Sequence, residues 1–403
     1  MRLSEIPSLV SVKRPPAPYG VRKLERCVAI DDLAALARRN LPSGAWAYLE
    51  GGGEGEYTLR RNRAAFDALE LLPHVLGDVS DVDTATTVLG GASPLPIVLS
   101  PVGAPRMFHH EGELAVARAA GHAGIPYAVS TMATVSVEAI AAQTAAPLGF
   151  QLYVWGDRGE ARGALARARA AGYRVLLLSV DTSVRSKRER ELHAGLSLPT
   201  PQLTLRTLAD GALHPGWAWH FMTSRALDFP NIGPGGAPSR AAIEDMFDGT
   251  VSWDDLDWIR DAWDGPVGIK GVLRADEAAR AADEGLDAVV VSNHGGRQLD
   301  HVPATIDVLP EIVEAVDGRL EVLLDSGIRR GSDIAAALAL GARAVLVGRA
   351  HLYGLAAAGE AGVRHAIDIL GHELRMTMAL CGAATLSGLD PELVRARRVP
   401  LAS

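Results

Sequence analysis

The segment Ser292-Asn293-His294-Gly295-Gly296-Arg297-Gln298 directly follows an apolar run at 286–291, which predicts a buried strand. Two glycines separate His294 from Arg297 and allow the backbone to turn sharply and approach a ligand closely. An imidazole can accept a proton near neutral pH, and a guanidinium can hold a carboxylate through two parallel hydrogen bonds. The pair therefore predicts a site for an anionic substrate that must lose a proton. For either residue alone, a core histidine or a surface ion-pair arginine is the alternative.

Seven other apolar runs resemble the one before this segment, and each is followed by a polar or glycine-bearing end and then by a helical pattern. The eight runs are Ile97–Leu99, Tyr127–Val129, Leu148–Leu152, Val175–Val180, Val267–Ile269, Ala288–Val291, Val322–Leu324 and Ala344–Val347. Predicted helices span 112–123, 135–143, 159–171, 252–263, 275–284, 305–316 and 332–340. Strands that are apolar on both faces and joined by helices predict a (β/α)8 TIM barrel of the α/β class. A doubly wound open sheet is the alternative, but no glycine-rich dinucleotide fingerprint follows the first strand.

Composition sets outer bounds on the function. The 403 residues are 48% hydrophobic and carry 40 basic against 48 acidic side chains, a formal charge of -8. Such a balance argues against a nucleic-acid surface. Cys27 and Cys381 lie far apart without metal-ligand spacing, which predicts a reduced cytoplasmic setting, no disulfide framework and no metal site. No run of about 18 apolar residues occurs, so we expect no membrane-spanning segment.

The remaining segments are assigned around the barrel. We predict an N-terminal arm at 1–29, a barrel domain at 30–390 and a C-terminal tail at 391–403. A helix from Ile30 to Arg39, capped by Asp31 or Asp32, precedes a second helix from Pro42 to the glycines at 51–53, which carries Tyr48.

An insertion at about 185–250 breaks the repeat after the fourth strand. It contains Pro199-Thr200-Pro201, Trp217, Trp219, Phe221 and Gly233-Pro234-Gly235-Gly236. Long loops of this kind serve as lids or docking surfaces. Its aromatic residues predict a contact with a membrane or a quinone, and a packed cover over the barrel mouth is the alternative.

Barrel enzymes carry their chemistry at the carboxyl ends of the strands, and here every strand ends in polar residues or glycine. These ends are Ser100-Pro101-Val102-Gly103, Ser130-Thr131, Gln151-Leu152-Tyr153, Ser179 with Asp181, Lys270-Gly271, His294 with Arg297, Asp325-Ser326-Gly327 with Arg329, and Gly348-Arg349. The last two ends predict a phosphate cradle, because glycine backbone N–H groups, arginines and helix N-termini meet there.

Two motifs, Ser292-Asn-His-Gly-Gly-Arg-Gln-Leu-Asp300 and Asp325-Ser-Gly-Ile-Arg-Arg-Gly331, resemble the FMN-dependent L-2-hydroxy acid dehydrogenase and oxidase family. That family includes glycolate oxidase, lactate oxidase, mandelate dehydrogenase and the respiratory L-lactate dehydrogenases. The likeness runs from about Ile30 to Gly388. Within the family, the N-terminal arm, Leu203–Thr207 and Gly348–Gly354 look most like actinobacterial L-lactate dehydrogenases that do not use NAD.

The resemblance implies FMN in the barrel mouth. Lys270 would face the N1 and O2 edge of the flavin, and Pro101, Val102 and Gly103 would lie near its N5 atom. Ser130, Gln151, Ser179 and Ser292 would hydrogen-bond the ring. Asp325 would join the cofactor site, and Gly327, Arg329, Gly348 and Arg349 would hold the phosphate.

The resemblance also implies the catalytic roles. His294 would remove a proton from the substrate, and Asp181 would stabilise the resulting imidazolium. Arg188 and Arg297 would clamp the substrate carboxylate, and Tyr48 and Tyr153 would orient the substrate. Met132 would face its side chain, where glycolate oxidase has a tryptophan. Ser326 stands where the family commonly has glycine. At the position of Gly103, some relatives have alanine.

The implied reaction is oxidation of a 2-hydroxy acid, L-lactate to pyruvate first, with a longer or mandelate-type acid as the alternative. Electrons would pass to a quinone or to O2, so an oxidase or a lactate monooxygenase stays open, as does the choice of hydride or carbanion mechanism. Relatives suggest a homotetramer. A barrel that binds a phosphate ligand without redox chemistry is the hypothesis from another class.

Overall fold

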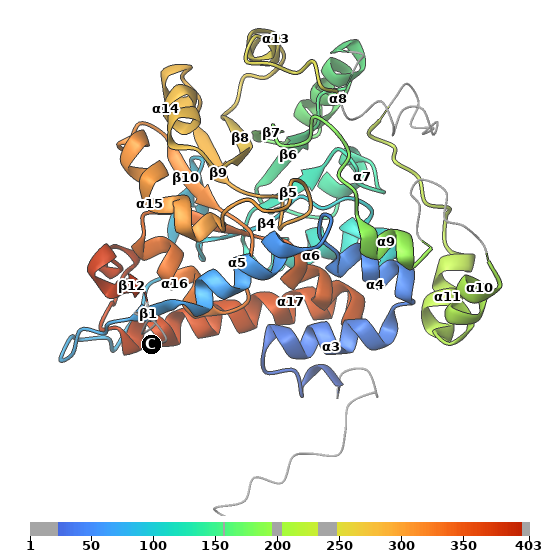
Figure 1. The fold of residues 1–403 in the computed structure, drawn as a ribbon, viewed down its shortest axis with the longest axis horizontal. Helices are drawn as coiled ribbons and strands as arrows, with labels where there is room; N and C mark the ends of the chain where they lie inside the picture. Colours follow the sequence, from blue (N-terminus) through green and yellow to red (C-terminus); the bar gives the residue numbers. More distant parts are fainter. Residues whose placement is uncertain (1–22, 156–157, 196–203, 233–247, 397–403) are drawn as a thin grey trace, which may run out of the picture.

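The computed structural model describes residues 23–155, 158–195, 204–232 and 248–396. At its centre eight parallel strands close into a barrel in the order β10-β11-β4-β5-β6-β7-β8-β9 (Figure 1). The strands are β4 (Ile97–Leu99), β5 (Tyr127–Ser130), β6 (Leu148–Leu152), β7 (Val175–Ser179), β8 (Val267–Val272), β9 (Ala288–Val291), β10 (Glu321–Leu324) and β11 (Ala344–Val347). Each contains or overlaps one predicted run. The closed order confirms the (β/α)8 barrel and excludes the open sheet, which would leave two edge strands.

Helices connect the strands and surround the barrel. They are α6 (Glu113–Ala123), α7 (Val137–Ala141), α8 (Arg158–Ala170), α13 (Asp255–Ala262), α14 (Ala275–Asp283), α15 (Thr305–Val316), α16 (Gly331–Ala339) and α17 (Arg349–Leu380). Helix α7 is shorter than the predicted 135–143, because it begins only after Ser136, whose hydroxyl caps the Ala139 N–H.

The register brings the polar strand ends to a common level. Ser130 of β5 pairs with Gln151 of β6, and Ser179 of β7 pairs with Lys270 of β8. Below them, one apolar cluster combines side chains from several barrel strands. Its buried members are Val88, Val98, Ala128, Leu177, Val290, Leu323, Ala344 and Leu346. Val88 belongs to a hairpin, β2 (Thr86–Val88) with β3 (Gly91–Ser93), which was not predicted.

Three N-terminal helices precede the hairpin: α3 (Ile30–Asn40), α4 (Ser43–Glu50) and α5 (Tyr57–Asp67). Ala29 is the N-cap residue of α3, so neither predicted cap residue occupies that position. Asp32 instead accepts hydrogen bonds from the backbone N–H groups of Val28 and Ala29. Helix α3 packs along α17, as Figure 1 shows. Helix α17 was not predicted and is broken at Ala358 and Gly359, whose backbone angles are not helical.

Both ends of the chain extend beyond the described residues. β1 (Leu69–Leu71) pairs antiparallel with β12 (Val394–Ala396), so part of the predicted tail lies against the barrel domain. The rest of that tail, 397–403, and residues 1–22 of the predicted arm lie outside the described ranges.

The insertion after β7 contains α9 (Glu189–His193), α10 (Leu205–Ala212) and α11 (Pro215–Thr223). Helices α10 and α11 lie at the right-hand edge of Figure 1. Trp217 donates a hydrogen bond from Nε1 to the Met107 carbonyl at 2.8 Å, and Asp210 accepts from the N–H and hydroxyl of Ser43 at 2.6 Å each. These bonds dock the two helices on α4 and on the segment after β4. Pro199-Thr200-Pro201 and the glycine-rich loop at 233–236 fall outside the described residues. Within the described ranges, no helix combines the length and apolar character needed to cross a bilayer.

Candidate active site

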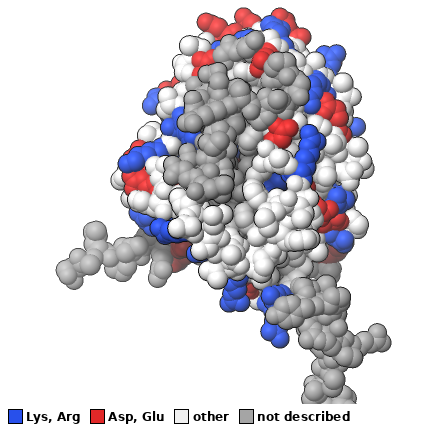
Figure 2. Space-filling model, turned by 90° about the vertical axis from the view of Figure 1, so that its right-hand side faces the viewer, with Lys and Arg blue, Asp and Glu red and all other residues white. Residues whose placement is uncertain are grey.

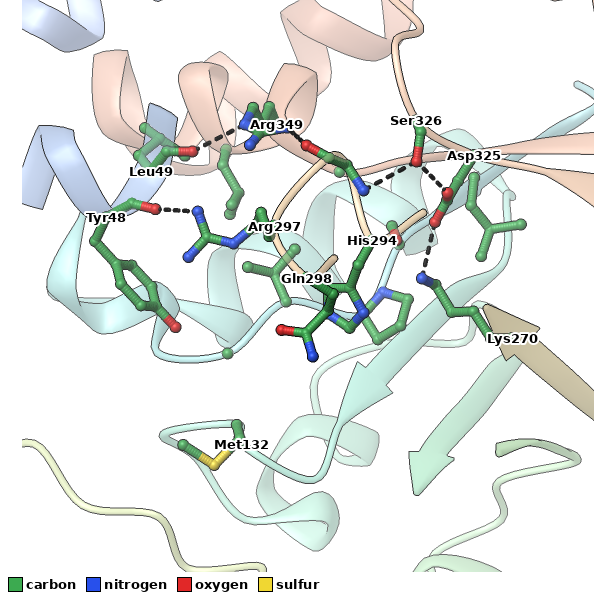
Figure 3. A pocket seen from close by; sticks show the side chains of 18 of the residues that line it. Tyr48, Leu49, Met132, Lys270, His294, Arg297, Gln298, Asp325, Ser326 and Arg349 are labelled. Carbon is green, nitrogen blue, oxygen red and sulfur yellow. Dashed lines mark hydrogen bonds and ion pairs between the residues drawn. The ribbon is translucent and has the colours of Figure 1, made fainter. Parts of the chain in front are cut away.

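A cavity opens at the carboxyl ends of the barrel strands, and Figure 3 shows it from close by. Its wall includes most of the residues that the sequence predicts for the site. These are Tyr48, Pro101, Val102, Gly103, Met132, Tyr153, Arg188, Lys270, His294, Arg297, Asp325, Gly327, Arg329, Gly348 and Arg349. They come from seven of the strand ends, from α4 and from the insertion. The fold therefore gathers residues that lie up to 301 positions apart in the chain, from Tyr48 to Arg349.

His294 lies at the end of β9 in a turn of three residues with positive φ: His294 at 57°, Gly295 at 68° and Gly296 at 71°. A Cβ on Gly295 would come within 2.8 Å of the Arg349 guanidinium, and one on Gly296 would meet the Leu59 backbone at 2.6 Å. Only glycine fits these two positions. The two glycines therefore allow the tight turn that presents the imidazole to the cavity.

Both ring nitrogens of His294 have partners. Nδ1 lies 3.1 Å from each carboxylate oxygen of Asp181, and Nε2 lies 3.3 Å from the Tyr153 hydroxyl. Burial lowers the pKa of His294 below its usual value, against the opposing charge of Asp181. Burial acts to raise the pKa of Asp181, but the interaction with His294, including the hydrogen bond to its ring, and the charge of Lys270 outweigh burial and lower the pKa. The pair thus consists of a neutral imidazole and an ionised carboxylate.

Tyr153 is partly buried beside this pair and lines the cavity. Burial, and then the charge of Asp181, raises the pKa of its phenol. The hydroxyl therefore keeps its proton and can donate a hydrogen bond into the cavity.

Arg297 and Arg188 share the carboxylate of Glu191, a residue that the sequence does not predict for the site. Glu191 on α9 lies 3.0 Å from Nη2 of Arg297 and 3.5 Å from Nη1 of Arg188, and its side chain is only 3% exposed. Burial, and then the like charge of Arg188, lowers the pKa of Arg297 to about 10. The spacing of Arg188 and Glu191, three residues apart on a helical turn, is the only sequence signal for this contact.

Arg297 also binds the end of helix α4, through the guanidinium nitrogen that does not contact Glu191. Its Nη1 donates to the carbonyls of Tyr48 and Gly51 at 2.7 and 2.8 Å, and the guanidinium carbon lies 4.9 Å from the centre of the Tyr48 ring. Arg297 therefore positions Tyr48 over the cavity, in addition to its predicted contact with substrate.

Lys270 supplies a buried positive charge to the cavity wall. Its Nζ lies 2.9 Å from the Ser292 hydroxyl and 2.9 Å from a carboxylate oxygen of Asp325. Burial acts to lower the pKa of Lys270, but the charges of Asp325 and Asp181 outweigh it and the pKa is raised. The ammonium group therefore stays charged at neutral pH.

Four predicted polar residues are buried but are not part of the cavity wall: Ser130, Gln151, Ser179 and Ser292. Gln151 accepts from the Ser130 hydroxyl at 2.9 Å and donates to the Ser179 hydroxyl at 3.1 Å. This chain of bonds runs across three neighbouring strands. In the structure these residues support the wall, and their contact with a flavin ring remains a prediction.

The predicted phosphate cradle lies where β10 and β11 end. Gly327 has φ of 105°, and a Cβ there would come within 3.0 Å of the Asn62 carbonyl. Arg329 donates from Nη2 to the Tyr353 hydroxyl at 2.9 Å and stacks on that ring. Arg349, the first residue of α17, donates to the carbonyls of Leu49, Gly295 and Gly51. Arg349 therefore fixes the turn beside His294 as well as adding charge to the cradle.

Ser326 occupies the position where the resemblance leads us to expect glycine. It has φ of 73°, a conformation that favours glycine. Its hydroxyl accepts from the Gly295 N–H at 2.9 Å and donates to Asp325 at 2.6 Å. The serine thereby ties the end of β10 to the turn that carries His294.

Comparison with known proteins shows that most of the chain matches a single protein family. The model of the FMN-dependent dehydrogenase family matches residues 37–396. The L-lactate dehydrogenase of Caulobacter vibrioides is 44% identical over 378 residues, 92% of this chain and 98% of that protein. A protein of Mycobacterium tuberculosis is 40% identical over 396 residues, 98% of this chain and 95% of its own.

Solved structures of similar sequence have the same fold. The monotopic membrane protein (S)-mandelate dehydrogenase superposes with a TM-score of 0.88 at 38% identity, covering 92% of this chain and 100% of the other. A mandelate oxidase with benzoylformic acid superposes with a TM-score of 0.78 at 37% identity, and the match covers 91% of this chain and 98% of the other.

Proposed function

We propose that this chain, which belongs to the FMN-dependent dehydrogenase family, oxidises an L-2-hydroxy acid to the 2-oxo acid, with L-lactate as the first candidate substrate. The family match over residues 37–396 confirms the resemblance predicted from the two glycine-bearing motifs. Its cofactor is FMN, as the family description states. The choice of lactate rests on the similarity to proteins named L-lactate dehydrogenase.

One observation carries the proposal: a neutral, carboxylate-paired imidazole and two arginines line the same cavity. A 2-hydroxy acid presents a carboxylate and a hydroxyl, and its oxidation requires the loss of a proton. Arg188 and Arg297 would hold the carboxylate. His294 would then take the proton at Nε2, while Asp181 at Nδ1 stabilises the imidazolium that forms. A barrel that only binds a phosphate ligand has no use for this arrangement.

The residues present fit FMN in charge and in backbone shape. Arg329, with Gly327 and the N-terminus of α17, would hold the phosphate, since a helix N-terminus and open glycine backbone favour an anion. Lys270 would lie against the flavin ring, where its positive charge would stabilise negative charge on the ring. Bound FMN supplies the acceptor for the two electrons that the substrate gives up.

A mandelate-type substrate is the second candidate. Similar structures carry the names mandelate dehydrogenase and mandelate oxidase. In this chain Met132 and Gly103 face each other in the cavity wall, where a flexible thioether beside a glycine can make room for a larger side chain.

We also propose that the insertion docks on a lipid surface and that the electron acceptor is a quinone. A similar structure is titled a monotopic membrane protein. Helices α10 and α11 and the turn between them expose large apolar side chains that would be costly in water but favourable at a membrane interface: Leu205, Leu208, Leu213, Trp219 and Met222. Peripheral attachment at the inner face of the membrane and a homotetramer are parts of this proposal. An oxidase or monooxygenase remains the alternative for the acceptor.

Anaerobic titration of the purified protein tests the function. L-Lactate should bleach the flavin absorbance fully, and (S)-mandelate in a parallel titration measures the second candidate. A colourless protein that rebinds no FMN, or a flavin that no L-2-hydroxy acid bleaches, would exclude the proposal. The yield of peroxide in air, compared with the rate of quinone reduction, separates an oxidase from a dehydrogenase.

A further inference from the structure

A second cavity, of about 350 Å³, lies on the other side of Phe108 from the active site. Its wall comes from α3, the segment after β4, helix α11 of the insertion and the break in α17. Four histidines line it, and we call it the histidine cavity: His109, His110, His214 and His220. The charged and aromatic side chains in the rest of the wall are those of Arg39, Arg106, Phe108, Trp217 and Phe221. Phe108 also lines the active-site cavity, so the two cavities adjoin at this residue.

Three of the histidines form a stack. The ring of His110 lies 4.3 Å from that of His109 and 4.2 Å from that of His220, the latter pair nearly parallel at 12°. Nδ1 of His110 is buried and has no hydrogen-bond partner among the described residues. A buried polar atom without a partner costs free energy, so a ligand that bonds to it would bind favourably.

The charge of the histidine cavity selects against cations. Two arginines belong to its wall, and no aspartate or glutamate is among its lining residues in the described part of the chain. Burial lowers the pKa of His109 to about 4, and burial also lowers that of His110. Both imidazoles are therefore neutral near pH 7, and each offers one N–H donor and one acceptor nitrogen.

The apolar walls are flat aromatic rings. Trp217 stacks on Phe221 with the ring centres 4.7 Å apart, and Phe108 stacks on Tyr48 of the active site at 6.0 Å. A planar ring would therefore be bounded by aromatic faces on the α11 side and by Phe108 on the active-site side.

A transition metal is the competing occupant. Ligand atoms of His109, His110 and Glu111 lie within 4.8 Å of one another. Glu111, however, is engaged by Arg118, and the Arg106 guanidinium lies beside His110. The parallel rings of His110 and His220 also do not converge on one point. These features disfavour a divalent cation at the histidine cavity.

We propose that the histidine cavity binds the ring of a quinone, which accepts the electrons that the proposed reaction delivers to FMN. A quinone is planar, uncharged and bears two carbonyl acceptors, which matches aromatic walls, N–H donors and a lining whose described residues include no carboxylate. The substrate loses two electrons and two protons, and the quinone gains two of each to become a hydroquinone, so the overall reaction balances. Neutral imidazoles can pass protons to the carbonyl oxygens.

The position of the cavity suits a lipid-soluble ligand. Helix α11 forms part of its wall, while Trp219 and Met222 of the same helix are 64% and 73% exposed. Figure 2 shows this face of the molecule, where a broad area carries neither acidic nor basic side chains. A quinone could therefore reach the cavity from the lipid that α10 and α11 are proposed to contact.

A pair of glycine substitutions tests the inference, which rests on the proposed function. Gly216 on α11 lines the histidine cavity and Gly211 on α10 does not, and a Cβ on either would meet no atom within 4 Å. Gly216→Phe should fill the cavity, whereas Gly211→Phe is the matched control. In an anaerobic stopped-flow experiment, L-lactate should reduce the flavin of both variants at the wild-type rate. Menadione should then reoxidise Gly216→Phe about tenfold or more slowly, and Gly211→Phe at the wild-type rate.

Photolabelling of the holoprotein by an azidoquinone gives a readout that does not depend on turnover. Label should appear in peptides covering 106–110 and 213–221, and excess menadione should suppress it. If Gly216→Phe does not fold, His220→Ala replaces it, with exposed His372→Ala as its control. The inference is overturned if the cavity variants reoxidise as fast as wild type, or if label falls elsewhere. It is equally overturned if Zn²⁺ binds stoichiometrically through His110 and no quinone does. Failure of L-lactate to reduce the wild-type flavin would instead contradict the proposed function.

Discussion

Nδ1 of His294 lies 3.1 Å from both carboxylate oxygens of Asp181, while Nε2 faces the cavity at 3.3 Å from the Tyr153 hydroxyl. An ionised carboxylate can only accept hydrogen bonds, so Nδ1 carries the proton and the lone pair of Nε2 points to the Tyr153 hydroxyl and the cavity. The carboxylate thus fixes both the tautomer and the direction of the base.

Replacing the base should stop the chemistry without removing the cofactor. In His294→Gln the side chain can no longer accept a proton, so flavin reduction by L-lactate should slow by at least about 100-fold. The FMN content after gel filtration should match the wild type, because His294 contributes none of the proposed phosphate contacts. Wild-type bleaching rates in this variant would contradict the role assigned to His294.

The pH dependence should report the environment of the same imidazole. Burial lowers the pKa of His294 from its ordinary 6.5, so the neutral base is the main form above that pH. We expect kcat/KM to fall at low pH, as His294 becomes protonated, with the midpoint of this acid limb below pH 6.5. Asp181 raises the pKa of His294, so Asp181→Asn should move this acid limb to still lower pH and reduce the maximal rate. A limb that moves upward in the variant would contradict the assignment.

Glu191 should be essential for stability although it was not predicted for the site. Its buried carboxylate is shared by two guanidinium groups, and Glu191→Ala leaves those charges without compensation. Breaking a buried ion pair from one side costs about 3 kcal/mol or more of unfolding free energy. Urea unfolding measures the loss, and Glu189→Ala on the same helix is the control, since Glu189 pairs with Lys187 on the surface. Equal urea midpoints for the two variants would show that Glu191 does not make this contribution to stability.

The barrel and most of its site could be predicted from the sequence because both depend on local patterns. Strands such as Ala288–Val291 are buried on both faces and therefore read as continuous apolar runs. The active residues follow these runs directly, as His294 does, and closure of the barrel brings all strand ends to one rim.

What the sequence did not reveal depends on contacts between distant segments. Glu191 looks like any surface acid of an Arg-rich helix until the fold buries it against Arg297. The stack of His109, His110 and His220 likewise arises only when α11 docks beside the segment after β4. Ser130, Gln151 and Ser179 bond to one another, a use of strand-end polar groups that spacing alone does not predict.

Ser326 allows backbone strain and hydrogen bonding to be separated. Ser326→Ala keeps a Cβ at φ of 73° and loses the bonds to Gly295 and Asp325, whereas Ser326→Gly loses the bonds but relieves the strain. The glycine variant should therefore be more stable than the alanine variant by about 1 kcal/mol. Thermal unfolding of the two variants side by side measures the difference. An alanine variant as stable as the glycine variant would show that this backbone position is not strained.

Gly103 should determine how large a substrate the cavity accepts. A Cβ at this position would lie 2.9 Å from the Met132 Cβ and 3.4 Å from the Tyr48 hydroxyl. In Gly103→Ala the backbone at Gly103 or Met132 must shift slightly, because the Met132 Cβ is fixed to its backbone, and the space between the two residues shrinks by about one methyl group. Such a loss of room changes discrimination by about 1–3 kcal/mol, a factor of roughly 10–200. We therefore expect kcat/KM for (S)-mandelate to fall by at least about tenfold relative to that for L-lactate. Initial rates with a quinone acceptor give both values for the variant and the wild type. A parallel loss for the two substrates would show that Gly103 acts on the cofactor or the fold instead of on the substrate side chain.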